Sequence, residues 1–253
     1  ATPVPTHFAL AREALLAGKD VFVEKPITLR AAEAEELVAL AQERRRILMV
    51  GHLLLYQPAI RWIKEQLTRG IIGDVVSLHQ KRLNLGKARA VENALWSLGV
   101  HDVAVLLYLV GELPVDVWAT GQSVVQPSVE DDVHVTMVFS NNVHAHLHCS
   151  WLWPEKRRQL VIVGTEGILV YDEPEQTVTL HRKRISSKLE SIDNGSEIVF
   201  TGDGRPLTIE CEHFLQAVQT RTKPLSDGES GRRVVLVLEK AQEMLDQARK
   251  TRF

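Results

Sequence analysis

The sequence contains little that would place the protein outside the ordinary globular class. Only two of its 253 residues are cysteines, Cys149 and Cys211, and they have neither metal-site spacing nor a disulfide framework. We therefore expect a reducing, cytoplasmic environment. No apolar run approaches the roughly 18 residues that a membrane span requires. The formal net charge is −2, so there is no basic field to attract nucleic acid.

A Gly-x-Gly-x-x-Gly motif is also missing. This glycine-rich turn holds the pyrophosphate of a dinucleotide at the first strand of a doubly wound fold, and an acidic residue that reads the adenosine ribose follows it. A dinucleotide-binding fold in this sequence would therefore lack its first βαβ units. We expect the 253-residue chain to be an N-terminally truncated form that binds the pyrophosphate poorly and is inactive alone.

Helical and strand patterns nevertheless alternate over residues 1–52. Apolar residues recur at helical spacing in 7–18 and 28–46, and a short, almost wholly apolar stretch follows each of them, at 20–24 and 47–56. Strands without polar alternation, separated by helices, indicate a parallel sheet covered on both faces. We therefore predict that these residues form the C-terminal half of a Rossmann-type domain.

The pattern changes after this segment. A long apolar helix is predicted to end at Gly111, and residues 114–200 read mostly as strands, with a polar loop at 186–197. The predicted fold class is α/β plus α+β. A partial Rossmann domain at 1–52 precedes a substrate-binding and oligomerisation domain at 53–253, which contains a large, open, mostly antiparallel sheet.

The stretch VFVEKP ends a short strand with an acid, a base and a proline. Ligands of open α/β sheets sit beyond the carboxyl ends of the strands, which is where Glu24 and Lys25 lie. Pro26 restricts Lys25 to an extended conformation, and a lysine held there is partly desolvated, which lowers its pKa. A solvated ion pair on a surface loop explains the same residues equally well.

Several short segments occur in an order shared with a known family. They are ATPVPTH at the start, EKP after the first strand, VGHLLLYQPAI from the second strand onward, LGVHD in the apolar helix and PLSDGESGRRVVLVLEKAQ near the end. Together they resemble the glucose–fructose oxidoreductase, inositol dehydrogenase and MocA (Gfo/Idh/MocA) family. The resemblance implies an NAD(P)-dependent oxidoreductase that acts on a sugar, polyol or sugar nucleotide.

The resemblance also implies where the cofactor, NAD or NADP, lies. The first loop and the ends of both strands would face it, with a cis peptide bond before Pro26. The cofactor-binding residues expected on this basis are Thr2, Pro3, His7, Glu24, Lys25, Pro26 and His52.

Oxidation of a secondary alcohol transfers a hydride to the cofactor and releases a hydroxyl proton, which the protein takes. The resemblance assigns this proton transfer to His101 with the assistance of Lys25, and an imidazole suits the role. Judged from the residues alone, a single histidine in an apolar helix is more often a packed side chain. Family members often have aspartates at the positions of Ser97 and Ala104, so the tuning of His101 and the substrate are expected to differ from those of inositol enzymes.

Polar side chains precede the helix of His101. Arg and Lys pair with phosphate oxygens, although a charged sheet edge would show the same pattern. The expected substrate-binding residues are Lys81, Arg82, Asn84, Asn93, Trp96 and Ser97. The segment ENALWSLGVHD resembles a bacterial branch of the family that acts on sugar nucleotides. That likeness implies oxidation of a ring hydroxyl, for example the 3-hydroxyl of a UDP-N-acetylhexosamine.

His144, His146 and His148 alternate along a predicted strand and so project from one face. In a row, at about 6.6–7 Å spacing, they do not converge on one zinc ion without a second element. We therefore expect no metal site. We interpret the row as part of an open polar face that forms a homodimer or homotetramer.

Two other classes of function are compatible with the sequence. Ser97, Ala104 and the missing glycine-rich turn also suit a non-catalytic sugar-binding or scaffold protein on the same fold. A metal-dependent enzyme that uses the histidines of residues 144–148 is a third alternative.

Overall fold

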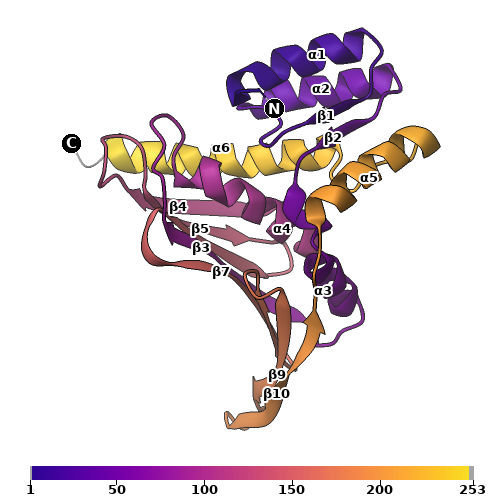
Figure 1. Cartoon of the computed structure of the whole chain (residues 1–253). Helices are drawn as coiled ribbons and strands as arrows, with labels where there is room; N and C mark the ends of the chain where they lie inside the picture. The colour runs from indigo at the N-terminus through magenta and orange to yellow at the C-terminus, as the bar shows by residue number, and fades with distance from the viewer. Residues whose placement is uncertain (1, 251–253) are drawn as a thin grey trace.

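The structure, a computed structural model, describes residues 2–250 and contains two sheets (Figure 1). The smaller sheet pairs β1 (Val21–Val23) with β2 (Leu48–Val50) in parallel. A 3₁₀ turn at Val4–Thr6 leads into α1 (His7–Leu16), and α2 (Ala31–Glu43) connects the two strands. The buried faces of both helices and both strands form one apolar cluster. The predicted parallel α/β arrangement is therefore confirmed.

The larger sheet has eight strands within the described residues, in the order β10-β9-β8-β7-β3-β6-β5-β4. Neighbouring strands run antiparallel except for β3 and β6, which are parallel. Their bounds are β3 (Val75–Leu85), β4 (Asp116–Gln122), β5 (Asp132–Val138), β6 (His144–Ser150), β7 (Leu152–Gly164), β8 (Ile168–Asp172), β9 (Thr177–Ile185) and β10 (Ser191–Thr201). This confirms the large, open, mostly antiparallel sheet.

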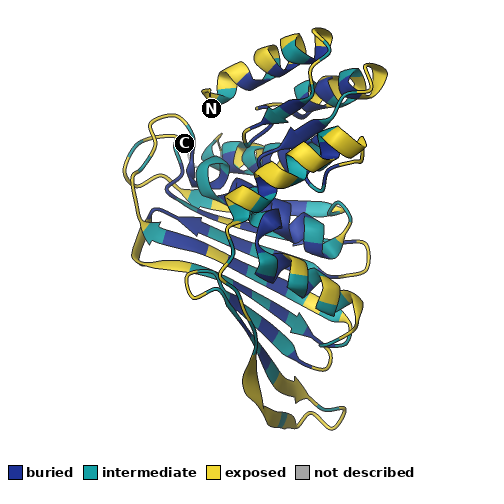
Figure 2. Cartoon of the chain, turned by 45° about the vertical axis from the view of Figure 1, so that its right-hand side comes forward, coloured by how far each residue is buried: buried dark blue, intermediate teal, exposed yellow. Residues whose placement is uncertain are grey.

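Helices cover one face of the larger sheet (Figure 2). They are a 3₁₀ turn η2 (Leu53–Tyr56), α3 (Pro58–Thr68), a π-helical turn η3 (Leu95–Gly99), α4 (Val100–Val110) and α6 (Gly228–Lys250). Helix α5 (Pro206–Thr220) packs against η2 and, through Phe214, against Phe22 of β1. Within residues 2–250, no helix combines the length and apolarity needed to cross a bilayer.

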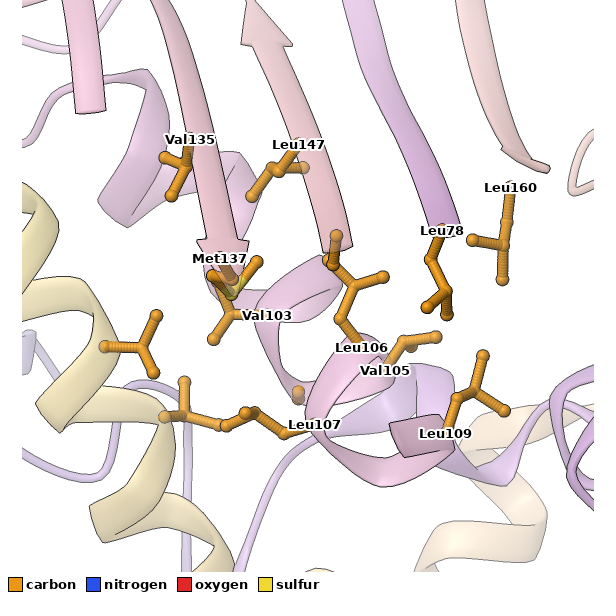
Figure 3. Packing of buried hydrophobic residues seen from close by; sticks show 14 of the residues in the cluster. Leu78, Val103, Val105, Leu106, Leu107, Leu109, Val135, Met137, Leu147 and Leu160 are labelled. Atoms are coloured by element: carbon orange, nitrogen blue, oxygen red, sulfur yellow. The ribbon is translucent and has the colours of Figure 1, made fainter. Parts of the chain in front are cut away.

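The apolar helix α4 packs directly on the sheet. Leu106 and Val103 of α4 lie against inward-facing side chains of the strands, including Leu147 and Leu78 (Figure 3). The helix ends at Gly111, which adopts the left-handed conformation with a φ of 97° and caps it as predicted. Because α4 is surrounded by sheet and helices, its sequence is apolar on nearly every side.

Helix α6 joins the two parts of the molecule. Val235 belongs to the apolar cluster of the small sheet, while Val234 belongs to that of the large sheet. Just before the helix, the backbone oxygen of Ser226 accepts a hydrogen bond of 2.7 Å from the Val50 amide. A Cβ at Gly231 would lie only 2.7 Å from the Val50 side chain, so glycine is what permits this close approach.

Two sequence-based assignments are wrong. The stretch 47–56 was predicted as one strand, but β2 ends at Val50 and residues Leu53–Tyr56 form a 3₁₀ turn. The polar stretch 186–197 was predicted as a loop, but most of it belongs to β10, which pairs with β9. This hairpin projects beyond the helices and is exposed on both sides (Figure 2), so its sequence carries no apolar alternation.

A buried ion network fixes α4 on the sheet. Arg82 of β3 donates from Nε to Asp102 of α4 at 2.7 Å and from Nη2 to Glu173 at 2.8 Å. Gln80 donates a further hydrogen bond to Asp102 at 2.9 Å. Burial alone would lower the pKa of Arg82, but the two carboxylates outweigh it and raise that pKa. The Arg82 guanidinium is thus charged and paired with both carboxyl groups.

Replacing Asp102 with alanine should destabilise the fold strongly, because it leaves the Arg82 guanidinium buried without its main partner. We expect a loss of about 3–5 kcal/mol in the free energy of unfolding, measured by urea denaturation. The control is Asp74→Ala at an exposed position, for which a change within about 0.5 kcal/mol is expected. Equal stability of the two variants would contradict the role given to the network.

Candidate functional site

The turn that follows β1 presents Lys25 and is held from behind by His7. The bond between Lys25 and Pro26 is cis, as the resemblance implied. One ring nitrogen of His7 lies 2.8 Å from the Pro26 carbonyl oxygen, and the other lies 3.0 Å from that of Thr2. His7 is buried and so ties the first loop to this turn, whereas Thr2 and Pro3 are exposed beside it. In the structure both ring nitrogens of His7, which was expected to bind the cofactor, face backbone carbonyl oxygens of the protein.

Lys25 reaches from the small sheet to the turn that begins the helix of His101. Its Nζ donates a hydrogen bond of 3.2 Å to the backbone oxygen of Ser97. Burial lowers the pKa of Lys25, although the nearby Glu92 and Glu24 carboxylates act in the opposite direction. The result is a partly buried ammonium group that gives up a proton more readily than a free lysine does.

His101 lies in the first turn of α4 and is half-buried. Its Nδ1 is buried and has no hydrogen-bond partner among the described residues. Burial first, and then the positive charges of Lys25 and Arg82, lower the pKa of His101 well below its usual range. A neutral ring with a free nitrogen is the state that a proton acceptor requires.

His52 completes the cluster at the end of β2. The side chain is 1% exposed, and neither ring nitrogen has a partner within residues 2–250. Burial, together with Lys25, lowers the pKa of His52 to about 3. His101 lies near enough to Lys25 and His52 for both to lower its pKa, and these three residues form the cluster considered below. His52 also lines a cavity together with Ala104. Because its lining includes neither Lys25 nor His101, we place the site at the cluster itself.

The π-helical turn before α4 contains Ser97 and ends just before His101, so it positions both residues. Such turns are rare and recur at functional sites. A Cβ at Gly99 would lie 2.9 Å from Leu95 and 3.0 Å from the sulfur of Cys149, so only glycine lets the turn approach β6 this closely. The backbone oxygen of Ser97, a residue expected to bind substrate, accepts the hydrogen bond from Lys25.

Several predicted substrate-binding residues have partners inside the protein. Arg82 is 4% exposed and belongs to the ion network of α4. Asn93 is 5% exposed, accepts a hydrogen bond from the Trp96 amide and donates to Glu130 and Gln242. The Trp96 indole donates to Gln242 as well. These contacts correct the expectation for Arg82 and Asn93, which brace the framework behind the cluster.

Lys81 and Asn84 lie on opposite faces of β3, because successive strand residues point to opposite sides of the sheet. Arg82 points toward α4, so Lys81 projects from the opposite face of β3, away from the helix that carries His101. Lys81 was expected to bind substrate, and in the structure it lies on the face of β3 opposite Arg82. Asn84 has the same parity as Arg82 and is half-buried near the end of β3.

Sequence reasoning missed Glu210 of α5. It is 2% exposed, its Oε1 has no partner within residues 2–250, and burial together with the Glu24 carboxylate raises its pKa to about 7. Glu24 itself lies over the end of β2, where a Cβ at Gly51 would come within 3.3 Å of its carboxylate. No local signal identified Glu210, since IECEH reads as an ordinary polar helix.

Comparison with known proteins places this geometry in a family. Residues 1–52 match the oxidoreductase family with an NAD-binding Rossmann fold, and residues 60–170 match the GFO/IDH/MocA C-terminal domain. The UDP-N-acetylglucosamine 3-dehydrogenase of Acidithiobacillus ferrooxidans is 31% identical over 235 residues, which are 92% of this chain and 74% of that protein. The chain belongs to the Gfo/Idh/MocA family of NAD(P)-dependent oxidoreductases.

Two solved structures and a second relative extend the comparison. A crystal form of the same Acidithiobacillus dehydrogenase has a TM-score of 0.85 at 30% identity, and the match covers 98% of this chain and 77% of the other. A levoglucosan dehydrogenase in complex with NADH has a TM-score of 0.84 at 20% identity, which shows the fold alone. The 2,7-anhydro-N-acetylneuraminate hydratase of Mediterraneibacter gnavus is 30% identical over 188 residues, and the match covers 68% of this chain and 50% of that protein.

The burial of His52 predicts a pH dependence of stability. Its folded pKa of about 3 lies below the unfolded value, so only the unfolded state takes up a proton as the pH falls below about 6.5. The contribution that neutral, buried His52 makes to the free energy of unfolding is thus complete at neutral pH and is lost on acidification.

Between pH 7 and pH 5, His52 should account for a loss of roughly 2 kcal/mol in unfolding free energy. In His52→Gln the loss over this interval should be smaller by that amount, measured by urea denaturation at both pH values. An unchanged difference would contradict the placement of a neutral, buried His52.

Proposed function

We propose that the protein containing this chain oxidises a ring hydroxyl of a sugar or sugar nucleotide with NAD or NADP. The observation that carries the proposal is the cluster of Lys25, His52 and His101 where β1 and β2 end, the edge at which such sheets bind ligands. Glu24 and the unpartnered nitrogens of His52 suit the nicotinamide end of the cofactor.

The proposed chemistry divides between cofactor and protein. Glu24 and His52 would hold the nicotinamide end of NAD or NADP, which would supply the hydride acceptor for the carbon that bears the hydroxyl group. Lys25 Nζ donates a hydrogen bond to the hydroxyl oxygen and stabilises the negative charge that develops on it. His101, held neutral by burial, accepts the hydroxyl proton. The Ser97 carbonyl holds Lys25 in position for this step.

For the substrate, we propose the 3-hydroxyl of a UDP-N-acetylhexosamine. The support is the 31% identical relative, which is a UDP-N-acetylglucosamine 3-dehydrogenase. The 30% identical hydratase also carries an N-acetylated sugar in its name, which favours an N-acetylated substrate over a plain polyol. Ser97 and Ala104, in place of carboxylates, leave the site less acidic than the family pattern does.

The second candidate is a non-catalytic sugar-binding or scaffold protein on the same fold. Ala104 favours it, because this buried methyl group offers neither charge nor a hydrogen bond near His101. Sugar-nucleotide binding without NAD(P)H formation in the full gene product would support this candidate over the dehydrogenase.

We also propose that a second copy of the chain covers the open face of the large sheet. Two large apolar side chains on that side, Trp118 of β4 and Trp153 of β7, are 49% and 40% exposed. Exposed aromatic side chains on a sheet face are typical of an interface between subunits. A cytoplasmic location remains an expectation that rests on the cysteine content.

The catalytic proposal predicts that Lys25→Met and His101→Gln each lower kcat by about 10²–10⁴-fold in the full gene product. The measurement is NAD(P)H formation with UDP-N-acetylglucosamine and related sugar nucleotides. Lys19→Met and His181→Gln are the matched controls and should keep wild-type turnover. Near wild-type turnover of Lys25→Met and His101→Gln with the best substrate would show that the site is elsewhere.

The interface proposal predicts that Trp118→Glu shifts the protein to monomers, because it places a charge in a face that a second copy covers. Size-exclusion chromatography with light scattering measures the mass. Val124→Glu, in an exposed loop, is the control and should leave the mass unchanged. A wild-type protein that is monomeric at micromolar concentration would refute the proposal.

A further inference from the structure

Five histidines on β3, β5 and β6 lie close together on the open face of the large sheet. They are His79 of β3, His134 of β5, and His144, His146 and His148 of β6. The three residues of β6 are spaced along one strand and do not converge, as the sequence indicated. The neighbouring strand supplies the second element that the row lacks.

The partner of His148 is on β5. In the antiparallel register His134 stands directly opposite His148, and their rings stack with centroids 3.8 Å apart. Asp132, two residues before His134, points to the same side of the strand. The Nε2 atoms of both histidines are close to its carboxylate, at 3.1 Å for His148 and 3.5 Å for His134. The three ligand atoms lie within 4.8 Å of one another.

These separations suit one metal ion. In a tetrahedral zinc site with bonds of about 2.0–2.1 Å, neighbouring ligand atoms are about 3.3 Å apart. Measured to one carboxylate oxygen, Oδ1 of Asp132, the Nε2 atoms of His148 and His134 lie at 3.3 and 3.5 Å, close to that value. Two imidazole nitrogens and one carboxylate oxygen form a donor set that zinc, cobalt and nickel accept, whereas calcium and magnesium prefer oxygen alone.

Two of the three ligand side chains are partly buried, and the third is exposed. The ring of Trp153 packs edge-on against His148, whose side chain is 17% exposed, and Asp132 is 25% exposed. His134 is 59% exposed and can adjust its ring to meet an ion. The second stacked pair, His79 with His146, has no such carboxylate, since Asp132, His134 and His148 are the one group of this kind within residues 2–250.

We propose that Asp132, His134 and His148 bind one divalent transition-metal ion of the zinc type. The ion would link β5 to β6 where β5 begins. The residues just before this point, Glu130 and Asp131, accept backbone hydrogen bonds from Ala94 and Trp151. An ion there would therefore brace the segment that leads into the turn of Ser97. Binding requires both imidazoles to be deprotonated, so it should weaken at acidic pH.

Isothermal titration of the tag-free protein with Zn²⁺, repeated with Co²⁺, tests the proposal. We expect one ion per chain, with His134→Ala and His148→Gln each binding at least about tenfold more weakly. Asp132→Asn should also weaken binding. The matched controls are His144→Ala and His79→Ala, which remove a histidine from the same face and should bind as the wild type does. Circular dichroism confirms that each variant is folded.

The Co²⁺ absorption spectrum gives an independent readout, because its visible bands report coordination by nitrogen and oxygen ligands. These bands should appear in the wild type and in His144→Ala but not in His148→Gln. The absence of stoichiometric binding to the wild type would overturn the proposal. Equal loss of binding in His144→Ala and His148→Gln would overturn it as well, since the ion would then lie along the row of β6.

Discussion

The ion pair between Arg82 and Asp102 determines how α4 is rotated about its own axis. Asp102 is held against the sheet by Arg82, which is itself anchored by Glu173. Consecutive helical residues differ in direction by about 100°, so fixing Asp102 also fixes where the preceding His101 points. A buried ion pair is an unreliable source of net stability, but a paired charge accepts few alternative positions. The proposed reaction depends on this orientation, because it requires His101 to face Lys25.

The site depends equally on the joint between the two sheets. Lys25 belongs to the small sheet and Ser97 to the large-sheet domain, yet their hydrogen bond crosses the joint. Three contacts stiffen it: the backbone bond from Val50 to Ser226, the hydroxyl bond between Tyr56 and Ser226, and the packing of α6 on both apolar clusters. A shift of one sheet against the other would separate Lys25 from His101.

Local patterns in the sequence predict the elements whose neighbours are close in the chain. The parallel strands, the helix that ends at Gly111 and the mostly antiparallel sheet all follow from periodicity and capping. Arg82 could not be placed in the same way, because its partners lie 20 and 91 residues further along. The same holds for Glu210, which is buried only because α5 returns to the small sheet. The pairing of Lys25 with His101 came from the family resemblance, since 76 residues separate them.

One register places the residues on both faces of β5 and β6, because side chains alternate between the two faces along a strand. Val135 and Leu147 face one another across these strands and are buried under α4, and the same register places His134 opposite His148 on the other face. A slip of one residue would expose Leu147 and bury a histidine beneath the helix, at a cost that the apolar core does not permit. The burial of leucine and valine therefore specifies the convergence of Asp132, His134 and His148. The polar cluster requires no separate stabilisation to form, so its residues remain available for a ligand.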